Sequence, residues 1–149
     1  MNLKRFEAWH GKHAPPDPTF FSAFIFLSNV LTTLYNGEYL YCLLFSLLFT
    51  SSIFYRLYYS NALFIIDTLA IALIVLYGGY VFYNRSIPLT QSLIILIAFI
   101  TCPIVFCYGY LTNQYCYHPD PAVGKAYTSL MHIISSIGHH LIARKSALQ

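Results

Sequence analysis

The sequence predicts an all-α integral membrane bundle of about five transmembrane helices. Only 9% of its 149 residues are charged and 58% are hydrophobic, whereas a soluble domain carries about 25% charged residues. Several apolar runs reach the roughly 20 residues that a membrane-spanning helix needs. Tyr and Phe gather at the ends of these runs, as in the aromatic belts of membrane proteins. The apolar content excludes a disordered chain, and the absence of a basic patch excludes nucleic acid as a partner.

The transmembrane domain is expected to cover residues 19–143, between a polar N-terminal tail (1–18) and a short basic C-terminal tail (144–149). Within lipid, a helix satisfies all of its own backbone hydrogen bonds, so each apolar run is taken as a helical span. The expected spans are 19–35, 39–59, 61–83, 88–111 and 124–143.

Local signals support the order of these spans. The second and third share one apolar stretch that is interrupted by a turn signal at 58–61, which predicts a tight helical hairpin. Pro103 lies inside the fourth span and lacks a backbone N–H, so a kink is expected there. The fifth span is the most polar of the set.

Five spans place the two termini on opposite sides of the membrane. The side of the N-terminus, called the near side, has one more basic residue than the far side. The positive-inside rule therefore favours a cytoplasmic N-terminus. The near-side residues are Lys4, Arg5, Lys12 and Lys125, and the far-side residues are Arg85, Arg144 and Lys145.

Three ionisable residues fall at a similar depth in the near-side leaflet. At 1.5 Å per residue, Arg56 and Asp67 lie roughly 7–9 Å from the turn between their spans, and His132 lies about 12 Å from the start of the fifth span. Because charges inside a membrane are costly, we expect Arg56 and Asp67 to form an intramembrane ion pair. Alternatively, Arg56 snorkels to the interface, and His132 donates a hydrogen bond to a carbonyl group.

Further along the fifth span, polar residues follow His132 at helical spacing, which indicates an inward-facing surface or a water-filled crevice. This polar stripe consists of Ser135, Ser136, His139 and His140. For the two histidines, solvation at the far interface is an alternative explanation.

Several short motifs resemble those of a known superfamily. The second span contains Ser52 and Arg56 as Ser-x-x-x-Arg, and the third contains Asp67. The fifth contains Thr128 and His132 as Thr-x-x-x-His, and the first contains Leu-Ser-Asn at 27–29. Their order and depth resemble the membrane hydrolases that include alkaline ceramidases, progestin and adipoQ receptors, and the post-GPI-attachment phospholipase and myomaker group. That superfamily normally has seven helices, and its motifs are Ser-x-x-x-His, Asp and His-x-x-x-His.

The resemblance implies a zinc ion held by three histidines that hydrolyses lipid amides or esters, with Ser52, Asp67 and His132 at the family's catalytic positions. In this chain Arg56 and Thr128 replace two of the three histidines, and a guanidinium group cannot ligate a metal. We therefore expect a pseudoenzyme without a cofactor that binds membrane lipids or a membrane-protein partner. The alternative is an active lipid amidase or esterase whose rearranged zinc site uses His132, Asp67 and a further donor such as His118.

Overall fold

The computed structural model describes residues 17–144, and every regular element in this range is helical. Residues 1–16 and 145–149 lie outside the described range, and so do Lys4, Arg5, Lys12 and Lys145, four of the charges used above to orient the chain. The elements are α2 (Pro18–Ala23), α3 (Ile25–Tyr35), α4 (Tyr39–Tyr58), α5 (Asn61–Tyr83), α6 (Leu89–Thr112), the 3₁₀ turn η1 (Tyr115–Tyr117) and α7 (Pro121–Ala143). The predicted all-α class is confirmed.

Four helical segments are long and apolar enough to cross a membrane: Pro18–Tyr35, Tyr39–Tyr58, Asn61–Tyr83 and Leu89–Tyr117. This is the composition of an integral membrane protein. The fifth long helix, α7, has 23 residues, as many as α5, but it is more polar. Its position explains this, because α7 packs against α2, α3, α5 and α6 inside the bundle.

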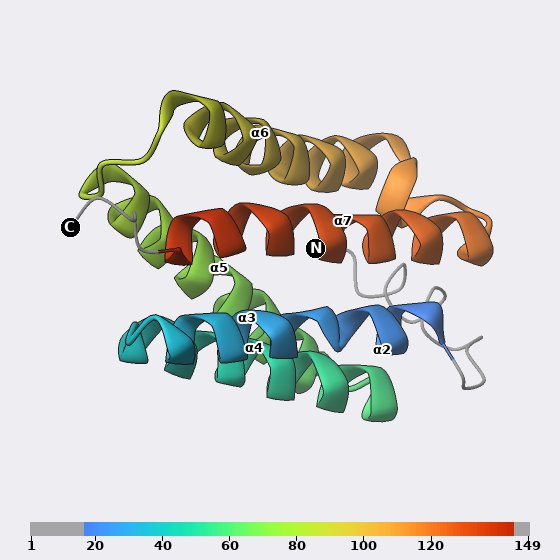
Figure 1. Cartoon of the computed structure of the whole chain (residues 1–149). Coiled ribbons are helices and arrows are strands. Elements are labelled where there is room, and N and C mark those ends of the chain that lie inside the picture. Colours follow the sequence, from blue (N-terminus) through green and yellow to red (C-terminus); the bar gives the residue numbers. More distant parts are fainter. Residues whose placement is uncertain (1–16, 145–149) are drawn as a thin grey trace.

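Helix α7 lies between α6 on one side and the α2–α3 pair on the other, as Figure 1 shows. Helix α4 packs against both α3 and α5, whereas α6 packs along α7 rather than against α5. The bundle is therefore held together by two helix pairs, α4–α5 and α6–α7, and α2–α3 contacts both of them.

A polar cluster marks each end of the bundle. At the near-side end, the Asp17 carboxylate accepts a hydrogen bond from the Tyr59 hydroxyl (3.0 Å) and lies 3.4 Å from Lys125 Nζ. At the far-side end, Arg85 pairs with Glu38 and donates to the carbonyl oxygen of Ile142 at 2.7 Å. These contacts join the ends of neighbouring helices.

The first predicted span is divided in two at Phe24, which separates α2 from α3. The backbone N–H of Phe24 donates to Phe21 O (3.1 Å), and Phe24 O accepts from Leu27 N (3.0 Å), so the chain tightens locally to three-residue turns. Elsewhere α6 continues as one helix through Pro103. At the α4–α5 turn, Tyr59 takes a left-handed conformation (φ 44°).

Gly78 lets α5 approach α4 and α7 closely. A Cβ atom added to Gly78 would lie 2.7 Å from the Tyr41 hydroxyl and 2.9 Å from His139 Cε1, whereas one added to the adjacent Gly79 would meet nothing within 4 Å. Tyr41 and His139 are themselves buried and hydrogen-bonded to each other. An added methyl group would therefore have to displace Tyr41 or His139 and disturb the hydrogen bond between them.

Gly78→Ala is therefore expected to destabilise the bundle by about 1–3 kcal/mol, the usual cost of overpacking a close-packed interior. Gly79→Ala is the matched control, because it makes the same change one residue away in open space. Thermal unfolding of both variants in detergent measures the difference. Equal midpoints for the two variants would contradict the close packing at Gly78.

Candidate functional site

A buried polar cluster lies between α4 and α5 near the near-side end. The hydroxyl groups of Ser51 and Ser52 donate to Asp67 Oδ1 at 2.9 and 2.5 Å. Arg56 Nη1 donates to Ser52 O (2.9 Å) and lies 4.0 Å from Asp67 Oδ2. Ser52 and Arg56 share one face of α4 because they are four residues apart. The α4–α5 hairpin brings Asp67 opposite that face.

His132 of α7 completes the cluster. Arg56 Nη2 lies 3.0 Å from His132 Nε2, and Ser22 Oγ lies 2.8 Å from His132 Nδ1. A guanidinium group only donates hydrogen bonds, so Nε2 must be the acceptor and the neutral ring carries its hydrogen on Nδ1. That hydrogen is donated to Ser22 Oγ, which itself donates to Thr19 O at 3.1 Å. Both nitrogens of His132 therefore have partners.

These residues do not fit a catalytic zinc ion. The Nε2 lone pair of His132 accepts from Arg56 and is not free to ligate, and a metal beside Arg56 would meet a permanent positive charge. Thr128, where the resemblance implies a second histidine, donates to Gly124 O at 3.0 Å. His118, the further donor considered above, accepts from the backbone of Asp120 in an exposed loop. Within residues 17–144, no three His, Cys, Asp or Glu side chains are grouped so as to hold a metal.

The polar stripe of α7 faces the bundle and makes specific contacts there. Ser136 Oγ accepts from Asn29 Nδ2 at 2.6 Å, and His140 Nε2 lies 3.0 Å from Ser28 Oγ. His139 is 6% exposed and is hydrogen-bonded to the Tyr41 hydroxyl, so burial rather than solvation defines its surroundings. The remaining member, Ser135, donates to His132 O (3.2 Å) and lines the cavity described next.

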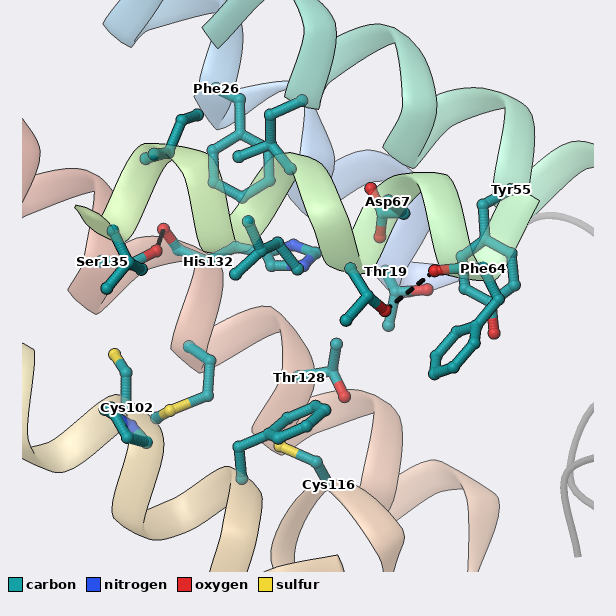
Figure 2. A pocket seen from close by; sticks show the side chains of 18 of the residues that line it. Thr19, Phe26, Tyr55, Phe64, Asp67, Cys102, Cys116, Thr128, His132 and Ser135 are labelled. Carbon is teal, nitrogen blue, oxygen red and sulfur yellow. Dashed lines mark hydrogen bonds between the residues drawn. The ribbon is translucent and has the colours of Figure 1, made fainter. Parts of the chain in front are cut away.

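Beside the cluster is a cavity of about 810 Å³ with mostly apolar walls. In Figure 2, Asp67 and His132 lie on one side of it, and Cys102, Cys116 and Thr128 lie on the other. Most of its wall residues come from α4, α5, α6 and α7, and a few come from α2, α3 and η1. Because α6 packs on α7 and not on α5, the cavity lies in the space between α5 and α6.

Sequence reasoning missed several partners of the predicted residues. Ser22, Ser51 and Tyr41 contact His132, Asp67 and His139 respectively, but a lone hydroxyl on an apolar helix gives no periodic signal. The Leu-Ser-Asn motif did mark two partners, because its Ser and Asn contact the α7 stripe. The structure brings Ser52, Arg56, Asp67 and His132 together, whereas Thr128 only shares their cavity.

Asp17 closes the near-side end of the cavity. Burial raises the pKa of its carboxyl group, but hydrogen bonds from Thr19 and Tyr59 and the charge of Lys125 outweigh burial and hold the pKa below its ordinary value of 3.8. Burial, with the nearby Asp17 charge, raises the pKa of Tyr59 to about 12. The ionised form of Asp17 is therefore the one that joins α2 to the α4–α5 turn and to α7.

The contacts of Arg56 and Asp67 predict the outcome of a double-mutant cycle. Arg56→Met or Asp67→Leu alone leaves an unpaired buried charge and should lower the free energy of unfolding by about 3–5 kcal/mol. The double variant removes both charges and should recover a large part of that loss. Denaturant unfolding in detergent measures the free energy of unfolding of all four proteins, from which the interaction free energy between Arg56 and Asp67 follows. Wild-type stability in both single variants would show that the pair does not support the fold.

The lowered pKa of Asp17 predicts an acid sensitivity. A carboxyl group with a lowered folded-state pKa contributes stability above its unfolded pKa and loses it as the pH falls through the folded value. The wild-type protein should therefore lose more stability than Asp17→Asn on acidification below about pH 4. Melting midpoints at neutral and acid pH measure this. The idea fails if Asp17→Asn shows the same acid loss as wild type.

No protein-family model, curated protein or solved structure matches this chain. The interpretation of the cluster therefore depends on its own geometry. The most informative contact is the hydrogen bond from Arg56 to His132 Nε2, because it occupies the lone pair that a metal ion would need.

Proposed function

We propose that this chain is a non-catalytic, multi-pass membrane protein that binds a membrane lipid, and that it derives from the zinc-hydrolase superfamily which its motifs resemble. The observation that carries the proposal is the hydrogen bond from Arg56 to His132 Nε2. In a hydrolase of this kind, the corresponding nitrogen would hold the metal. Here it accepts from a permanent cation on the neighbouring helix.

In this proposal Arg56 takes over the electrostatic role of the metal. Its guanidinium group lies 4.0 Å from Asp67 and 3.0 Å from His132, so it supplies a positive charge between α5 and α7. It cannot polarise and deprotonate a bound water as zinc does. The polar cluster is thus retained as a structural support, and the hydrolytic chemistry is lost.

The cavity supports the binding part of the proposal. Its volume of about 810 Å³ lies in the usual range for small-molecule sites, about 300–1,000 Å³. Its walls are mostly apolar, and its charged residues lie toward the near-side end. It lies between two helices whose outer faces are apolar and exposed, such as Leu69 and Leu76 on α5. A lipid can reach such a site from within the bilayer.

The same proposal includes the topology. Helix α7 crosses the membrane as a fifth span, shielded from lipid by its neighbours, so that its polar residues face the bundle. Five crossings separate the termini, and the basic residues favour a cytoplasmic N-terminus. A helix of a membrane-protein partner is the other occupant that the space between α5 and α6 could take.

Metal analysis of purified protein tests the loss of the zinc site. The wild-type chain is expected to lack stoichiometric zinc, whereas Arg56→His/Thr128→His, which supplies two further histidines beside His132, is expected to bind about one zinc per chain. The same double variant with His132→Ala is the matched control and should bind none.

Two results would count against the proposal. Stoichiometric zinc in the wild type that is lost in His132→Ala would favour the active hydrolase with a rearranged site. A folded Arg56→His/Thr128→His variant that stays free of metal would show that positions 56 and 128 do not correspond to the superfamily's ligands.

A further inference from the structure

We propose that the cavity selects an uncharged amphiphile whose headgroup presents one hydrogen-bond-accepting oxygen to Arg56 Nε. This inference rests on the proposed function, because it assumes that a lipid occupies the cavity. It adds the chemical class of that lipid. Three features of the described residues support it: an unpartnered buried donor, a balance of charge, and an apolar channel for the chain.

The unpartnered donor is Arg56 Nε. Arg56 is 8% exposed, and it lines the cavity. Its Nη1 donates to Ser52 O and its Nη2 to His132 Nε2, but its Nε has no acceptor among residues 17–144. A buried donor without an acceptor is costly. Nε itself has almost no accessible surface, so a ligand oxygen would bond to it after a small movement of the Arg56 side chain, and that bond would remove the cost. Nη1 and Nη2 each have an acceptor already, so Nε is the guanidinium nitrogen that has none within the described range.

The charges around the cavity decide between an anionic and an uncharged headgroup. The charged residues that line it are Asp17, Arg56, Asp67 and Lys125. They form two opposite pairs, Arg56 with Asp67 and Lys125 with Asp17, and so sum to zero. A carboxylate or phosphate would add a negative charge with no counterion in an apolar site, which is strongly unfavourable. A hydroxyl group or an ester carbonyl group adds no charge to the site.

The chain of the amphiphile fits the space between α5 and α6. From the polar cluster the cavity continues along two apolar walls that do not pack against each other. The lining residues on these walls include Ile71, Ile74 and Val75 of α5 and Phe99, Pro103 and Phe106 of α6. An acyl chain between these walls would leave the headgroup beside Arg56.

A photo-cross-linking experiment on the full chain tests the proposal. The probe is a diazirine-bearing monooleoylglycerol, added to the purified protein in phosphatidylcholine nanodiscs. Labelling should fall on α5 and α6 peptides. Val75→Trp, which fills the cavity, should abolish it, whereas Leu76→Trp, on the exposed face of the same helix, should leave it unchanged.

Competition then measures the headgroup preference. Monoolein should displace the probe about tenfold better than oleate at alkaline pH, and about tenfold better than a hydrocarbon of the same chain length without a headgroup. Arg56→Lys keeps a cation opposite Asp67 but lacks the Nε–H, so it should reduce this preference. The comparison with the hydrocarbon uses only wild-type protein and does not depend on the folding of that variant.

The outcomes separate this inference from the proposed function. Oleate that competes as well as monoolein, or a hydrocarbon that does so, would overturn the headgroup assignment and leave lipid binding intact. Labelling that is absent from α5 and α6, or unaffected by Val75→Trp, would overturn occupancy of the cavity, and the proposed function with it.

Discussion

The bundle depends on a single buried guanidinium group. Arg56 of α4 contacts Asp67 on α5 and His132 on α7, and through His132 it is linked to Ser22 on α2. The hydrocarbon core of a bilayer offers no hydrogen-bond partners, so these side chains bond to one another across helices and to backbone oxygens of their own helices. The requirement fixes the rotation of three helices relative to one another. It also explains why α7, although the most polar helix, lies at the centre of the bundle.

The scarcity of charge made part of this site predictable. In a chain with 9% charged residues, the few ionisable groups inside apolar spans stand out, and the helical rise gives their depth. Counting residues from each turn placed Arg56, Asp67 and His132 at one level, where the structure brings them together. The all-α class followed equally directly, because length and hydropathy define a membrane helix almost without reference to packing.

What the sequence did not predict depends on packing and local backbone geometry. The division at Phe24 lies in an apolar run with no Gly or Pro, so nothing local signals the tightened turns. The pairing of Tyr41 with His139 depends on the close approach at Gly78, which is a tertiary property. The cavity is likewise a consequence of which helices fail to touch. The pattern of apolar and polar residues along a helix predicts which face of that helix is buried. It does not predict where two helices leave a cavity between them.

The composition of α7 has a consequence for how the protein is made. Helices α2–α5 precede it in the chain and include three segments that are long and apolar enough to cross a membrane. Helix α7 carries three histidines and several hydroxyl groups, whose partners are on α2, α3 and α4. If α7 crosses the membrane as proposed, its isolated polar side chains resist transfer into lipid, so α7 would have to be inserted alongside helices that are already in the membrane. On that proposal, insertion would be ordered from the N-terminus, and α7 would enter the membrane only after the earlier helices had formed the surface on which it packs.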